Sequence, residues 1–151
     1  MKFRLFIVAA LFAVLCGCGR PTSSEQFVKL GAKDADGLYH YKVDLSDSLC
    51  TYDVLFYSRI DCNNVKLAGV RDFPMTVTWI SPDDRKYSEK VYFKVRKESE
   101  DEDFYSNQYM IPYRTGLVPV QWGEWEITVR IDSDRYIPGF RGLGLICRKN
   151  I

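Results

Sequence analysis

Histidine is almost absent from this chain, and so are the short motifs that mark common catalytic sites. His40 is the only histidine among 151 residues. Zinc sites and histidine-based catalysis usually combine a histidine with further histidines or with clustered cysteines, and no such spacing occurs here. GxSxG, HExxH and CxxC motifs are missing after residue 18, and so is a glycine-rich phosphate loop. The sequence therefore predicts a protein that is not an enzyme and that holds no cofactor.

An excess of charge of either sign is missing as well. Lysine and arginine total 21 against 20 acidic residues, which gives a formal net charge of +1. Lys2 and Arg4 lie in a predicted signal peptide, and loss of these two cations changes the net charge to −1. Proteins that bind nucleic acid carry a basic patch or stripe, so no nucleic-acid partner is expected.

The chain lacks an apolar run long enough to cross a membrane. Its longest such run covers residues 5–15, whereas a membrane-spanning helix needs about 20 apolar residues. Lys2 and Arg4 precede this run, as in a secretory signal peptide. We therefore expect residues 1–17 to be a signal peptide that is removed from the mature protein.

The cysteine that follows the signal indicates lipidation. Residues 15–18 read Leu-Cys-Gly-Cys and resemble a bacterial lipobox, which predicts that Cys18 carries the acyl chains, palmitate among them. Cys16 is the competing candidate, but the bulky Leu15 precedes it where a small residue is expected. Residues 18–37 are expected to form the lipidated cysteine and a flexible tether. No aspartate and no acidic tract follows Cys18, which favours the periplasmic face of the outer membrane.

The remaining residues, 38–151, predict an all-β domain. Ten Tyr, nine Phe and three Trp suit pleated sheets. Strands are expected at residues 38–45, 51–60, 75–80, 87–95, 108–114, 124–131 and 140–147, separated by turn residues such as those at 81–84. Trp125, Ile127 and Val129 alternate with polar neighbours, which is typical of an antiparallel strand with one wet face. Seven or eight such strands predict a two-sheet, jelly-roll-like β-sandwich, with a barrel as the alternative.

Several residues are candidates for ligand or partner contact. Trp122, Tyr113 and Trp79 could present aromatic faces, although Trp125 is expected in the core. Carboxylates at Glu100, Asp101, Glu102 and Asp103 form a weak candidate for a calcium loop, which lacks the glycine turn such loops need. A solvated charged loop explains this run better. Glu124 and Glu126 share a strand face without a recognisable cleft, so they are expected on a solvated surface.

The remaining cysteines and glycines are interpreted as structural. Cys50 and Cys62 bracket one expected strand, which would hold them about 35 Å apart and far beyond the ~7 Å limit for a disulfide. Cys147 would have to take part in any bridge, and burial of all three as small apolar residues is favoured. Glycines at residues 139, 142 and 144 predict a bulge or a close backbone approach.

Four segments together resemble a known family. Residues 52–60, 79–83, 123–127 and 139–144 are similar to the gliding-motility lipoprotein H (GldH-like) family of the Bacteroidetes. The resemblance implies a lipoprotein of the cell envelope that is associated with gliding machinery, and it supplies no catalytic residues. We therefore expect a lipid-anchored, non-catalytic component with an envelope protein as partner. A carbohydrate-binding accessory lipoprotein is the alternative, and a hydrolase ranks third.

Overall fold

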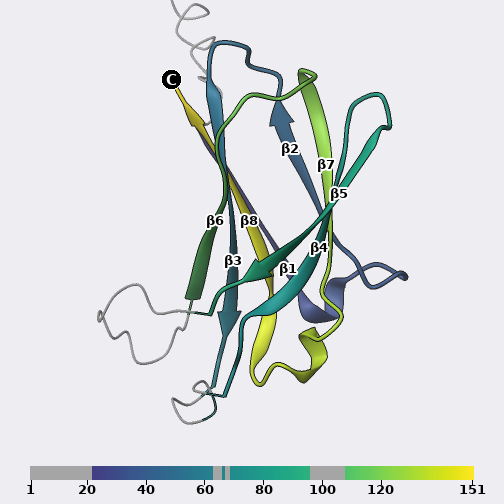
Figure 1. Cartoon of the computed structure of the whole chain (residues 1–151), viewed down its shortest axis with the longest axis vertical. Helices are drawn as coiled ribbons and strands as arrows, with labels where there is room; N and C mark the ends of the chain where they lie inside the picture. Colours follow the sequence, from purple (N-terminus) through teal and green to yellow (C-terminus); the bar gives the residue numbers. More distant parts are fainter. Residues whose placement is uncertain (1–21, 63–65, 67–68, 96–107) are drawn as a thin grey trace, which may run out of the picture.

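The computed structural model describes residues 22–62, 66, 69–95 and 108–151, and these residues form eight strands (Figure 1). The strands are β1 (Ser23–Lys29), β2 (Tyr39–Leu45), β3 (Thr51–Ile60), β4 (Phe73–Ile80), β5 (Lys86–Phe93), β6 (Gln108–Leu117), β7 (Gly123–Arg130) and β8 (Phe140–Asn150). Two single-turn 3-10 helices, η1 (Leu30–Ala32) and η2 (Asp134–Tyr136), complete the described elements. The prediction of an all-β domain is confirmed.

The strands pair into two antiparallel four-stranded sheets, in the orders β1-β8-β3-β6 and β2-β7-β4-β5. The first half of the chain pairs with the second half as in one long hairpin, through the strand pairs β1·β8, β2·β7, β3·β6 and β4·β5. Successive pairs along this hairpin alternate between the two sheets. This order is that of a jelly roll. The two-sheet sandwich is therefore the correct choice over the barrel.

The structure corrects the expected boundary between tether and domain. Residues 23–29 lie within the expected tether of residues 18–37, yet they form β1, which pairs with β8 from Ser23↔Arg148 to Lys29↔Gly142. Most of β1 is exposed, so its sequence carries no apolar alternation by which to recognise a strand. Backbone pairing holds it, and the Gln26 amide bonds both the N–H and the C=O of Lys42 at the edge of β2. The folded domain therefore begins near Thr22 rather than at residue 38.

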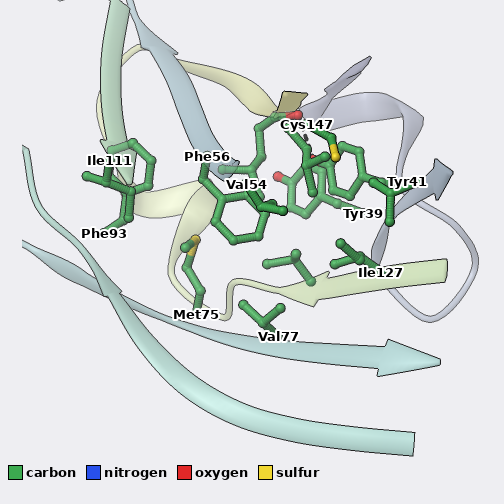
Figure 2. Packing of buried hydrophobic residues seen from close by; sticks show 14 of the residues in the cluster. Tyr39, Tyr41, Val54, Phe56, Met75, Val77, Phe93, Ile111, Ile127 and Cys147 are labelled. Atoms are coloured by element: carbon green, nitrogen blue, oxygen red, sulfur yellow. Dashed lines mark hydrogen bonds between the residues drawn. The ribbon is translucent and has the colours of Figure 1, made fainter. Parts of the chain in front are cut away.

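The core between the sheets follows the alternation of the strands. Every second residue of β2 is buried, from Tyr39 to Leu45, and the residues between them are exposed. Figure 2 shows side chains of both sheets meeting in this core, with Val54 and Phe56 of β3 near Met75 and Val77 of β4. Each fully buried large side chain stabilises the fold by about 1.5–3 kcal/mol. Tyr41 is buried with its hydroxyl donated to the Leu143 carbonyl at 2.7 Å, so its polar atom is satisfied.

The C-terminal glycines lie where the backbone approaches another group too closely for a side chain. A Cβ at Gly139 would lie 2.1 Å from the Asp61 carbonyl oxygen, and one at Gly144 would lie 2.1 Å from the Tyr57 ring. Gly139 also adopts a φ of +73°, in the left-handed region that favours glycine. The expectation of close approach is confirmed at these positions.

One end of the sandwich holds the start of β1 and the end of β8. The Lys149 N–H donates to the Thr22 carbonyl at 2.7 Å, which fixes Thr22 beside the C-terminus. The register places the β2–β3 (residues 46–50), β4–β5 (81–85) and β6–β7 (118–122) connections at this same end, as Figure 1 shows. We call it the N-terminal end of the sandwich. The η2 turn between β7 and β8 lies at the opposite end.

Candidate functional site

A groove opens between the β4–β5 hairpin and the connection from β6 to β7. Its volume is about 340 Å³, within the range of about 300–1,000 Å³ typical of ligand sites. Trp79, Tyr87, Glu89, Arg114, Val118 and Trp125 are among its lining residues. Most of the lining is apolar, with Glu89 and Arg114 as its charged groups. The groove is therefore suited to apolar or aromatic groups with a small polar component.

Aromatic rings form the floor of the groove. Tyr87 and Trp125 lie with ring centroids 6.1 Å apart, and Trp125 contacts Trp79 edge-on at 5.9 Å. Trp79 and Trp125 are buried, whereas Tyr87 is 46% exposed at the rim. The Trp125 indole donates to the Gln121 carbonyl at 2.8 Å, which connects the floor to the β6–β7 connection. The floor is thus joined to the β6–β7 connection by a hydrogen bond, and one aromatic side chain at the rim, Tyr87, is accessible to a ligand.

A hydrogen-bonded chain closes one side of the groove. The Trp79 indole N–H donates to the Tyr113 hydroxyl at 2.8 Å, and that hydroxyl donates to the Glu89 carboxylate. Arg114 also donates to Glu89, and its guanidinium lies 4.9 Å from the centre of the Tyr113 ring. Burial and then the bond to Glu89 raise the pKa of Tyr113 well above its usual 10, so its hydroxyl remains a donor. Because Glu89 is on β5 and Arg114 on β6, this chain joins the two sheets.

The structure separates the three aromatic residues expected to contact a ligand. Trp79 lines the groove, and Tyr113 lies behind it as a hydrogen-bond partner. Trp122 is 41% exposed and lies outside the groove lining. Sequence reasoning missed Tyr87, Glu89 and Arg114. Tyr87 could have been found, because a hairpin turn at residues 81–84 places it opposite Trp79.

The single histidine lies away from the groove. His40 Nε2 is 2.5 Å from Asp34 Oδ2 at the surface. The hydrogen bond from the Leu38 N–H, and to a smaller extent the one with the His40 ring, lowers the pKa of Asp34 below its usual 3.8. Within the described residues, Asp34 is the one hydrogen-bond partner of the His40 ring. This pair has the geometry of a surface ion pair rather than of a nucleophile and its base.

The paired carboxylates also belong to a wet sheet face, as expected. Glu124 lies 3.2 Å and Glu126 4.0 Å from the Lys42 ammonium on the neighbouring strand, and both carboxylates are exposed. The acidic run Glu100, Asp101, Glu102 and Asp103 lies outside the described residues, as does Cys18. In the described part of the chain, no group of three or more potential metal ligands converges.

No disulfide joins any two of the three described cysteines. Cys50 and Cys147 are buried in the core, and Cys62 is partly exposed at the end of β3. The ten-residue strand β3 separates Cys50 from Cys62, as the expected strand at residues 51–60 implies. Burial raises the pKa of the Cys147 thiol to about 11, so it stays protonated. All three cysteines contact the core, as small apolar residues do.

Comparison with protein-family models finds no match, and comparison with curated proteins finds none either. Among the described residues, no helix is both long enough and apolar enough to cross a bilayer. The groove and the surface chemistry of the sandwich therefore carry the functional argument.

Proposed function

We propose that this protein is a lipid-anchored component of the cell envelope that holds a protein partner without catalysing a reaction. The aromatic-floored groove is the observation that carries the proposal. It is concave and mostly apolar, and its lining includes the apolar side chains of Val118 and Val120, which are 59% and 83% exposed. Exposed apolar clusters of this kind mark interaction surfaces. The lipobox at Cys18 supports anchoring at the periplasmic face of the outer membrane.

A protein partner is favoured over a glycan by the arrangement of the rings. A sugar-binding face would offer a row of exposed aromatic rings, whereas none of the ring pairs among the described residues joins two exposed rings. The apolar rim at Val118 and Val120 instead suits aliphatic or aromatic side chains of another protein. The resemblance to gliding-motility lipoproteins favours a partner within an envelope machine.

Site-specific photo-crosslinking in the producing cell tests the partner. A photoreactive phenylalanine analogue at Tyr87 should give one discrete protein adduct, because Tyr87 is accessible at the rim of the groove. The same analogue at Lys90, an exposed β5 residue outside the groove lining, is the matched control. Adding Val118→Asp should remove the Tyr87 adduct, because a charge would then occupy the apolar rim. Equal adducts at both positions, or binding to a glycan that Tyr87→Ala abolishes, would contradict a protein partner.

The anchor has its own test. Cys18→Ala should leave the protein unprocessed or release it from the membrane fraction, because the thiol is the predicted acylation site. Cys16→Ala is the control and should behave as wild type. Normal processing and membrane association of Cys18→Ala would show that lipidation at this residue is wrong.

A further inference from the structure

Exposed apolar side chains gather at the N-terminal end of the sandwich. Leu49 of the β2–β3 connection is 89% exposed, and Val118, Val120 and Trp122 of the β6–β7 connection are 59%, 83% and 41% exposed. These four residues form what we call the apolar tip. Leu49 and Trp122 do not line the groove, so the apolar tip extends beyond the proposed partner site. An apolar surface of this size is unfavourable in water unless something covers it.

The connections hold these side chains outward through hydrogen bonds. The Asp47 carboxylate accepts the Leu49 N–H at 3.0 Å, and the Asp47 N–H donates to the buried Tyr52 hydroxyl at 2.9 Å. On the other connection, the Gln121 carbonyl accepts the Trp125 indole N–H at 2.8 Å. The apolar tip is therefore pre-organised, which lowers the entropic cost of binding through it.

The predicted lipid is attached close to this same end. Three residues lie between Cys18 and Thr22, and the four Cα–Cα steps that join the two span at most about 14 Å when extended. Thr22 is fixed at the N-terminal end of the sandwich by its bond from Lys149. The anchoring membrane must therefore lie within about this distance of Thr22, at the end of the sandwich that also carries the apolar tip. Interfacial side chains enter the boundary between headgroups and acyl chains by about 5–10 Å, so the apolar tip can reach it.

The chemistry of the tip fits a membrane interface. Tryptophan is enriched at the headgroup level of membranes, where its ring is buried and its N–H stays hydrated. Charges at this end are mixed, because Asp47, Asp83 and Asp84 are matched in number by Arg85, Arg148 and Lys149, so no net attraction to anionic lipid is expected. Contact through apolar side chains should therefore persist at high salt, which screens charge interactions.

Resting on the proposed lipid anchor, we infer that the apolar tip inserts into the interface of the bilayer that holds the acyl chains of Cys18. The sandwich then stands on the membrane by two contacts, the covalent lipid and the apolar tip. Its orientation is fixed, with the η2 turn and Tyr136 pointing away from the bilayer. Val118 and Val120 belong to both the groove and the apolar tip, so the groove opens at the membrane surface and its protein partner must bind there, next to the bilayer interface.

Fluorescence quenching in vesicles tests this inference. The mature lipidated protein is reconstituted into phosphatidylcholine vesicles that carry bromine near the headgroup end of the acyl chains. Trp79 and Trp125 are buried, so the loss of emission should come from Trp122 and should be absent in Trp122→Tyr. The loss should be unchanged at high salt. Leu49→Ser combined with Val120→Ser should reduce the quenching of Trp122. Unchanged quenching in that variant would contradict the insertion of these residues as one apolar tip.

A matched control places the fluorophore at the other end. Tyr136 is 85% exposed at the end opposite Thr22, so Tyr136→Trp in the Trp122→Tyr background should show no quenching by the brominated lipid. Protein that floats with the vesicles while Trp122 is quenched only by an aqueous quencher would overturn the tip contact and leave the anchor standing. Protein without acyl chains by mass spectrometry, and absent from the floating fraction, would overturn the anchor and with it the inference.

Discussion

Replacing Gly139 by alanine should destabilise the fold by more than the cost of placing alanine in a left-handed backbone conformation. Gly139 and Gly37 have nearly the same φ, +73° and +74°, but a Cβ at Gly37 would meet nothing within 4 Å. A left-handed backbone costs a non-glycine residue about 1–2 kcal/mol, and reduced freedom of the unfolded chain offsets about 0.4–1 kcal/mol of this. Gly37→Ala should therefore cost about 1 kcal/mol.

The Gly139→Ala variant adds a steric conflict that the control lacks. Its Cβ would lie 2.1 Å from the Asp61 oxygen and 2.5 Å from the Asp61 carbonyl carbon. Asp61 cannot easily retreat, because its N–H bonds the Gly139 carbonyl at 2.8 Å and its carboxylate pairs with Arg141 at 2.9 Å. Overpacking of this kind costs about 1–3 kcal/mol, which brings the expected loss to about 2–4 kcal/mol.

Urea denaturation of the two variants measures the difference. Both should keep the wild-type dependence of the unfolding free energy on urea, and the midpoint of Gly139→Ala should lie clearly below that of Gly37→Ala. Equal midpoints would refute the reasoning, because they would mean that the backbone at Asp61 can move away from the new Cβ without loss of unfolding free energy.

Three further outcomes follow from the hydrogen bonds and burial of single side chains. The Gly116 N–H lowers the pKa of Asp53 below its usual 3.8, so this carboxylate stabilises the fold above that pH and less as the pH falls through the lowered value. Asp53→Asn should therefore flatten the acid side of a plot of melting temperature against pH, and an unchanged slope would contradict this. Tyr113→Phe leaves the Trp79 indole without its acceptor and should cost about 1–3 kcal/mol in urea denaturation, whereas a neutral result would mean that water replaces the hydroxyl. Iodoacetamide at neutral pH should modify Cys62 before Cys147, because burial raises the pKa of Cys147 to about 11. Early modification of Cys147 would contradict its burial, and a Cys50–Cys62 disulfide in non-reducing mass spectrometry would contradict the separation of these two residues by β3.

The predictability of each element from the sequence depended on where its side chains lie. β2 and β7 were predicted because their apolar residues alternate onto a buried face, as in Trp125, Ile127 and Val129. The strand β1 could not be predicted in the same way. It is an edge strand with one large apolar residue, Phe27, and the backbone hydrogen bonds that hold it leave no pattern in the side chains.

The groove was predictable only in part, for a similar reason. Trp79 and Tyr113 could be proposed as aromatic candidates one by one, but their contact with Glu89 and Arg114 depends on how two sheets stack. Residues on β5 and β6 belong to different sheets, so no strand register connects them. The apolar tip is likewise a product of topology, because Leu49 and Trp122 are distant in sequence and lie at the same end only through the directions of their strands.

The direction of β1 has a mechanical consequence. β1 begins at the N-terminal end of the sandwich and runs away from it, antiparallel to β8, with seven residue pairs from Ser23↔Arg148 to Lys29↔Gly142. Tension on the proposed lipid anchor at Cys18 would pull along the axis of this strand, so the pairings would be loaded together in shear and would not open one after another. An anchor at the start of β1, as proposed, would thus transmit force into the sheet, and a domain pulled by its partner should resist detachment of β1 better than if the same strand were peeled from its far end.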